Sequence, residues 1–151
     1  MNTQPPSWLV YPDSRVELRL GTSHEKPELE VIGSPQGLAS LAGVFLWLEA
    51  YGSDHACLSI SGLPFVSPEG RIALSIVFVM GDSPFHGRVV RVDKDRQFEW
   101  QVCEENLVKV ALSLHRVATN ADYIDYLAVS LSPESDALLR FQAVPVGQHA
   151  T

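Results

Sequence analysis

Residues 33–52 read GSPQGLASLAGVFLWLEAYG, and this stretch determines what the rest of the chain must pack against. Ser34 can cap a helix with its side-chain oxygen, and Pro35 suits the first helical position because its missing N–H would have no partner there. Apolar residues then recur at steps of three and four, and Gly52 provides a C-terminal stop. We therefore predict one principal helix over residues 35–50. Its apolar stripe consists of Leu38, Leu41, Ala42, Phe45 and Leu48.

Few residues of this predicted helix are polar, namely Gln36, Ser40 and Glu49. A helix that exposes one face to water normally carries more charge than this. We therefore expect a second cover besides the sheet, either the apolar segment 8–11 or a partner chain in a homodimer through residues 35–50. The cover from within the chain is favoured, because exposed apolar patches on monomers are normally small.

Most of the remaining chain alternates between apolar and polar residues with the period of a β-strand. The segment 71–80 is apolar on both faces, which is typical of a central strand. Two further segments flank Lys94-Asp95 and predict a hairpin. The predicted strands comprise residues 15–20, 28–32, 56–61, 71–80, 87–93, 97–102, 123–131 and 137–144.

Residues 107–117 fit two structures. Apolar residues at every second position from Val108 to Leu114 favour a strand, but apolar residues at steps of three and four fit a helical face as well. Acidic residues before the segment and basic residues at its end would also complement a helix dipole. The content of β-branched residues leads us to predict a strand.

These elements predict an α+β fold in a single domain over residues 1–151, with an irregular lead-in over 1–14 and a loose tail over 147–151. Because most connections are short, the sheet should be mainly antiparallel and meander-like, with the principal helix packed on it. The one evident crossover is the connection that runs through this helix.

The composition is that of a globular protein. Of the 151 residues, 46% are hydrophobic and 19% are charged, and the formal net charge is −7. This charge would repel a nucleic-acid backbone, and no basic stripe offsets it. The chain shows neither a signal-peptide pattern nor an apolar run of the roughly 18–20 residues that a membrane helix needs. We expect a cytoplasmic protein that binds neither nucleic acid nor membranes.

No catalytic residue, metal site or cofactor is predicted. In a strand, His55 and Cys57 would point to the same face and could hold a metal with Cys103 or His86, and either cysteine could act as a nucleophile beside a histidine base. Cys103 would stand at a helix start, where thiols become more reactive, if residues 107–117 were helical. Structural zinc sites normally show paired ligands, so we interpret the cysteines as core residues and the histidines as loop residues. The histidines are His24, His55, His86, His115 and His149.

Residues 33–37 resemble a glycine-rich turn into a helix, where backbone N–H groups could hold an anion. The lysine and the spacing of a phosphate-binding loop are missing, and Pro35 removes one donor. A capped helix is therefore a sufficient explanation of this segment.

Six acidic residues cluster along the sequence without the pattern of a calcium loop. If they share a surface, that surface could receive a basic protein, because charge complementarity speeds association and selects partners. We therefore predict a binding surface for a protein partner. Its residues are Asp82, Asp93, Asp95, Glu99, Glu104 and Glu105.

Residues 28–60 run from a strand through a glycine-containing turn and a leucine-rich helix into a second strand, which follows a histidine. In this pattern they resemble small immunity proteins of bacterial polymorphic-toxin systems. The resemblance implies a cytoplasmic non-enzyme that binds and neutralises a toxin, a role that the acidic charge suits because many toxins are basic. The matching positions are Gly33, Gly37, Leu38, Leu41, Leu48 and His55.

Two alternatives to a protein-binding domain stay open at this point. One is a self-associating structural subunit, which the apolar principal helix favours. The other is a small-ligand or enzyme domain with a pocket between helix and sheet.

Overall fold

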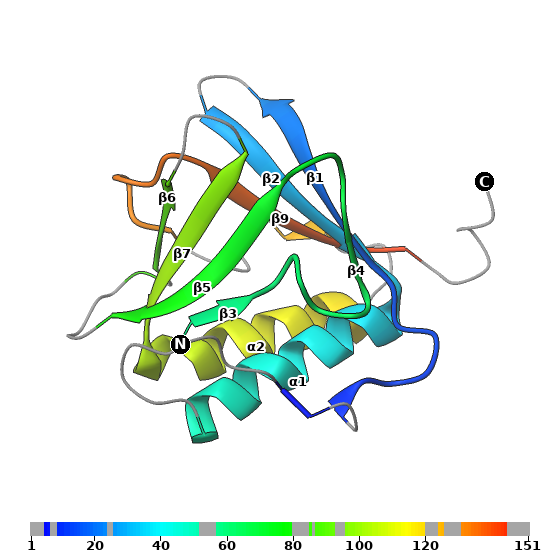
Figure 1. Ribbon diagram of the computed structural model, residues 1–151. Helices are drawn as coiled ribbons and strands as arrows, with labels where there is room; N and C mark the ends of the chain where they lie inside the picture. The colour runs from blue at the N-terminus through cyan, green and yellow to red at the C-terminus, as the bar shows by residue number, and fades with distance from the viewer. Residues whose placement is uncertain are drawn as a thin grey trace.

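A computed structural model describes residues 5–6, 9–23, 26–51, 57–79, 85, 87–92, 96–119, 124–125 and 131–144 (Figure 1). Within these residues the chain forms two helices and nine strands. The helices are α1 (Pro35–Tyr51) and α2 (Glu104–Thr119). The strands are β1 (Val16–Ser23), β2 (Lys26–Gly33), β3 (Cys57–Ser59), β4 (Val66–Pro68), β5 (Ala73–Val79), β6 (Arg88–Arg91), β7 (Gln97–Cys103), β8 (Ile124–Asp125) and β9 (Leu138–Ala143).

The strands form two mixed sheets. One has five strands in the order β4-β1-β2-β9-β8, and the other has four strands in the order β3-β5-β7-β6. β1 pairs antiparallel with β2, and β6 with β7, whereas the pairs β1–β4, β2–β9 and β5–β7 are parallel. The predicted α+β fold is confirmed, and four of the seven strand pairs among the described residues are antiparallel. The sheets are mixed rather than purely antiparallel, their strand orders depart from a meander, and a second helix accompanies the predicted one.

Separation along the chain explains the parallel pairs. β9, which pairs with β2, follows both helices in the sequence. β6 lies between β5 and β7 in the sequence and reverses the chain direction, so that β7 runs parallel to β5. The prediction assumed that short connections join neighbouring strands. It could not detect pairing between segments that lie far apart in the sequence.

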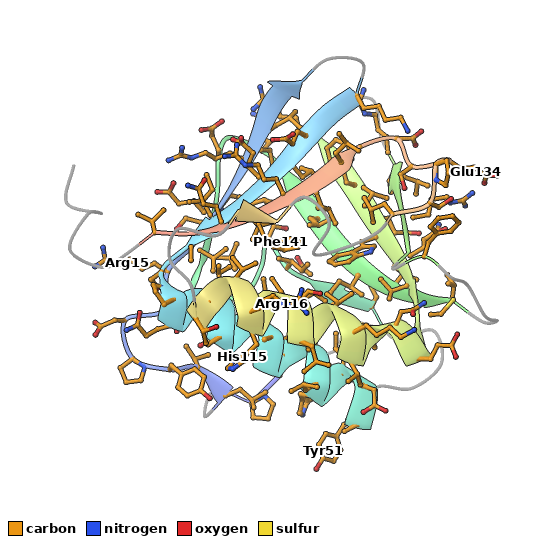
Figure 2. All side chains as sticks on the ribbon, turned by 180° about the vertical axis from the view of Figure 1, so that it is seen from behind. Arg15, Tyr51, His115, Arg116, Glu134 and Phe141 are labelled. Carbon is orange, nitrogen blue, oxygen red and sulfur yellow. The ribbon has the colours of Figure 1, made fainter. Side chains whose placement is uncertain are left out.

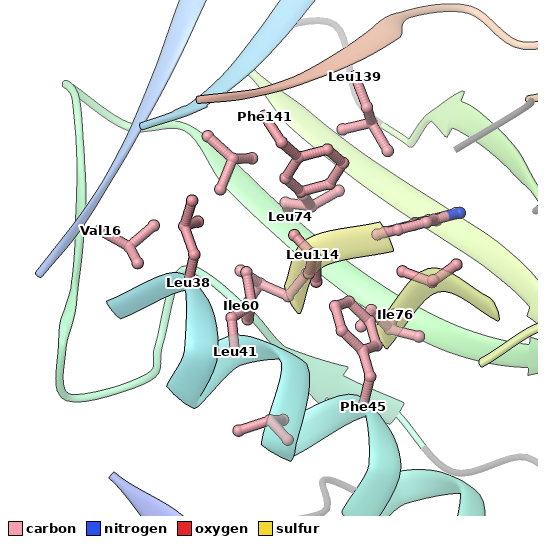
Figure 3. Close-up of a cluster of buried hydrophobic side chains, with 14 of the residues drawn as sticks. Val16, Leu38, Leu41, Phe45, Ile60, Leu74, Ile76, Leu114, Leu139 and Phe141 are labelled. Atoms are coloured by element: carbon pink, nitrogen blue, oxygen red, sulfur yellow. The ribbon is translucent and has the colours of Figure 1, made fainter. Parts of the chain in front are cut away.

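The two helices lie side by side and cover the sheets from one side. Figure 1 shows α1 and α2 beneath the sheets, running in opposite directions. Both helices and both sheets contribute to one cluster of buried apolar side chains (Figure 3). Trp100 of β7 joins the layers, because its ring centroid lies 5.5 Å from that of Phe45 in an edge-on contact and 6.4 Å from that of Phe141.

The predicted helix over residues 35–50 is confirmed as α1. Ser34 caps it as expected, since its Oγ accepts a hydrogen bond from the N–H of Gly37 at 3.0 Å. All residues of the predicted apolar stripe are buried. Gly52, the predicted stop, lies outside the described residues.

The predicted strand over residues 107–117 is wrong, because these residues belong to α2. The exposed Leu112 breaks the strand-like alternation, and the buried side chains recur at helical spacing. A β-branched residue costs a helix about 0.5 kcal/mol relative to alanine, which is less than the burial of one apolar side chain contributes. Packing against α1 therefore overrides the local preference for a strand. The buried apolar residues of α2 are Leu107, Val110, Ala111, Leu114, Val117 and Ala118.

Most predicted strands are confirmed, with ends shifted by a few residues. β5 lies between β3 and β7, as expected of a central strand, and β6 and β7 form the predicted hairpin. In the segment 123–131 the structure describes a strand only at Ile124–Asp125. The predicted tail 147–151 and Trp8 of the lead-in lie outside the described residues. No helix in the described part of the chain is both long and apolar enough to cross a bilayer.

Candidate functional site

The two helices expose large apolar side chains. Leu46 and Tyr51 of α1 are 46% and 75% exposed, and Leu112 of α2 is 61% exposed. Trp47 is half-buried, with its ring centroid 6.4 Å from that of Tyr51. Figure 2 shows Tyr51 projecting from the end of α1, away from the sheets. We call Leu46, Trp47, Tyr51 and Leu112 the outer helix face.

Other described segments cover parts of α1. α2 packs along α1, and the lead-in reaches Ser40, whose Oγ accepts the N–H of Tyr11 at 2.9 Å and lies 2.7 Å from the Ser14 Oγ. The expected second cover from within the chain is therefore present around Ser40. Among the described residues, no other segment comes within 4 Å of the place where a Cβ on Gly43 would lie.

Charged side chains border Leu112 on α2. Glu105, Lys109 and Arg116 are exposed, and their helical spacing places them on the same side of α2 as Leu112. His115 is exposed beside them, and Figure 2 shows it with Arg116 on α2. An apolar centre with a charged surround is the usual composition of a protein–protein interface.

Of the six acidic residues predicted to bind a partner, the structure describes two side chains. Glu99 lies on β7, where its carboxylate accepts a hydrogen bond from the Gln101 Nε2 at 3.0 Å. Glu105 is exposed in the first turn of α2, at the border of the outer helix face. A surface shared by all six stays a prediction. The structure does not describe the side chains of Asp82, Asp93, Asp95 and Glu104.

Of the four candidate metal ligands, the structure describes only Cys57 and Cys103. No group of three or more His, Cys, Asp or Glu residues in the described part of the chain could hold an ion. Cys57 is half-buried on β3, Cys103 is buried where β7 meets α2, and no disulfide joins them. Because α2 is a helix, Cys103 stands directly before a helix start. Four of the five histidines lie outside the described residues, namely His24, His55, His86 and His149.

The sequence left an anion site at the start of α1 as the alternative to a capped helix. In the structure, groups of the chain itself occupy this place. The N–H of Ser34 donates to the carbonyl oxygen of Arg15 at 2.9 Å, and the N–H of Arg15 donates to the Ser34 Oγ at 3.1 Å. The absence of side chains on Gly33 and Gly37 lets the Arg15 backbone pass over them. The capped-helix interpretation therefore accounts for these residues.

A cleft of about 300 Å³ lies where the start of β1 meets β4. Its lining includes the exposed side chains of Arg15 and Glu17 together with Pro64 and Phe65. It opens at a sheet edge, so it is not the pocket between helix and sheet that the ligand-binding alternative required.

Sequence reasoning missed the outer helix face. Leu112 was assigned to a strand, and its exposure follows only from the helical structure of α2. One signal was available for α1, because Leu46 and Trp47 lie away from its buried stripe and are too apolar for a solvated helix surface.

Comparison of this chain with protein-family models, with curated proteins and with solved structures found no match.

Proposed function

We propose that this chain is a non-enzymatic protein-binding domain that receives its partner on the outer helix face. The observation that carries the proposal is the exposure of the large apolar side chains of Leu46, Tyr51 and Leu112 on the two helices. Contiguous exposed apolar residues mark interaction sites, and aromatic side chains contribute much of the energy at protein interfaces. Burial of each half-exposed side chain would contribute about 1 kcal/mol before the cost of ordering the interface.

The proposed partner is a basic protein. The net charge of −7 favours the approach of a positively charged protein over long range. The resemblance of residues 28–60 to immunity proteins supports the same class of partner, namely a toxin that this domain would neutralise in the cytoplasm.

Self-association is the second candidate, and the surroundings of Gly43 favour it. Because no other described segment comes within 4 Å of a Cβ position on this glycine, the backbone of a second α1 could approach closely there. A homodimer through residues 35–50 would also remove Leu46 and Trp47 from water.

Affinity purification from the native host, with the whole chain as bait, tests the first candidate. We expect a basic protein to be retained by the native chain and lost with Leu46→Glu or Leu112→Glu. Val92→Glu is the matched control, because Val92 is 60% exposed but follows β6, outside the helix layer. Retention of the partner by both helix-face variants would contradict the proposal, as would turnover of a small molecule without any protein partner.

Sedimentation of the purified chain separates the two candidates. A monomer at micromolar concentration would exclude self-association as the function. A dimer that dissociates with Leu46→Glu but persists with Val92→Glu would replace the first candidate by the second.

A further inference from the structure

One edge of the five-stranded sheet is only partly paired. β1 pairs with β2 along its whole length, from Val16 to Ser23. On its other side β1 pairs with β4 only from Val16 to Leu18. Among the described residues, no strand lies beside β1 on that side from Arg19 to Ser23.

The hydrogen bonds of β1 show which backbone groups face this open edge. The N–H of Val16 donates to the carbonyl oxygen of Phe65 at 2.9 Å, and the carbonyl oxygen of Leu18 accepts the N–H of Glu69 at 2.7 Å. Backbone groups alternate in direction along a strand, so those of Leu20 and Thr22 also point away from β2. Leu20 makes no backbone hydrogen bond on that side to any residue that the structure describes.

Two other sheet edges are blunted by the fold. On β4, the N–H of Val66 donates to the carbonyl oxygen of Leu63 at 3.0 Å, and Pro68 has no N–H to offer. On β6, residues 132–136 cover the edge, with the N–H of Asp136 donating to the carbonyl oxygen of Val89 at 2.7 Å. An edge with regularly spaced donors and acceptors, such as the one at Leu20 and Thr22, recruits an extended backbone.

We propose that the β1 edge at Leu20 and Thr22 binds an extended strand of a partner protein, which joins the five-stranded sheet as an added strand. The antiparallel direction is assigned because antiparallel pairs are the more stable per residue. Two residues of the added strand would then bond to Leu20 and Thr22, and the residue between them would lie opposite Gly21. This surface is separate from the outer helix face, and the proposal goes beyond the function inferred above.

The side chains beside the edge define the chemistry of the added strand. Leu20 is half-buried and packs against the core, so an apolar residue opposite it would extend the buried layer. On the outward side Gly21 has no side chain, and the Glu30 carboxyl carbon lies 3.3 Å from the position that a Cβ there would take. Glu30 also pairs with Arg140 at 2.9 Å, and its side chain is 20% exposed. A lysine or arginine opposite Gly21 can therefore reach a carboxylate, so the predicted added strand has a basic residue there, next to an apolar residue opposite Leu20.

The test combines the whole chain with the synthetic peptide acetyl-Thr-Val-Lys-Val-Thr-amide and follows amide hydrogen exchange at single residues. Without peptide, the amides of Leu20 and Thr22 should exchange fast, whereas the bonded amide of Val16 should be protected. With peptide at millimolar concentration, exchange at Leu20 and Thr22 should slow by about tenfold and exchange at Val16 should stay the same. The control peptide carries N-methyl groups on both valines, which removes its donors but keeps its side chains.

Unchanged exchange at Leu20 and Thr22, or equal protection by the N-methylated peptide, would overturn the proposal. If the chain formed a dimer in which these amides were protected without peptide, the edge would be assigned to a second copy of the chain. That result would also overturn the proposal. Glu30→Gln should weaken binding of the lysine peptide by about threefold and leave a peptide with glutamine in place of lysine unaffected. Leu46→Glu should not alter peptide binding, so failure of the edge proposal and failure of the helix-face proposal are distinguishable.

Discussion

The carbonyl oxygen of Arg15 lies directly over the Cα of Gly37, in the first turn of α1. A Cβ on Gly37 would stand 2.8 Å from both the carbonyl carbon and the nitrogen of Arg15, and closer still to the oxygen. The same oxygen accepts the N–H of Ser34 at 2.9 Å. The start of β1 and the start of α1 are thus held together by backbone contact, which ties the five-stranded sheet to the helix layer.

Gly37→Ala should destabilise the fold by about 2 kcal/mol. The clash is with backbone that cannot move without breaking the Ser34 hydrogen bond, and this cost exceeds the gain of about 1 kcal/mol in helix propensity. Gly43→Ala is the matched control in the same helix, where open space should let the full gain of about 1 kcal/mol appear. Urea unfolding of both variants measures the difference, and equal stability of the two would contradict the contact.

Ser34→Ala should lower the free energy of unfolding by about 2 kcal/mol, at the upper end of the range for a helix cap. The Ser34 Oγ accepts the N–H groups of Gly37 and Arg15 and donates to the carbonyl oxygen of Asp13 at 2.9 Å. Ser67→Ala, on the exposed edge of β4, should change stability by less than about 0.5 kcal/mol. Thermal unfolding compares the two variants, and a similar small effect of both would show that the Ser34 bonds are not stabilising.

Phe45→Ala and Leu46→Ala should differ strongly although the residues are neighbours in α1. Phe45 is fully buried against Trp100, so its loss should cost about 3–5 kcal/mol through lost burial and the cavity that remains. Leu46 points outward, so its replacement should cost less than about 1 kcal/mol. Chemical unfolding, followed by the fluorescence of the buried Trp100, measures both, and a reversed order would contradict the orientation of α1.

Arg140→Met should destabilise the five-stranded sheet more than Arg19→Met. The Arg140 Nη1 lies 2.9 Å from the Glu30 Oε2 and 3.7 Å from the Oε1 of the buried Glu28, so its loss should cost about 2 kcal/mol. Arg19 pairs with Glu17 at the surface, where such a pair contributes about 0–1 kcal/mol. Urea unfolding at low and high salt tests this order. Equal losses, or losses that salt abolishes in both variants, would show that burial does not strengthen the Arg140 pairs.

The local sequence pattern predicted those interactions whose two partners are close in the sequence. The Ser34 cap spans three residues, and the β6–β7 hairpin joins adjacent strands, so both were accessible from the sequence. The candidate site was less accessible, because it combines α1 with an exposed position of α2. Exposure of Leu112 depends on which side of α2 packs against α1, and the sequence between 107 and 117 fitted a strand equally well.

The sequence alone determined the position of α1, the strand-rich α+β class and the apolar character that makes α1 a packing centre. Each of these follows from short-range periodicity and capping, which are properties of neighbouring residues. The tertiary structure decided that residues 104–119 are helical, that β2 pairs with β9 and β5 with β7, and that β1 pairs with β4 only from Val16 to Leu18. These features depend on contacts between distant segments, where the burial of many side chains outweighs local preferences of a few tenths of a kcal/mol per residue.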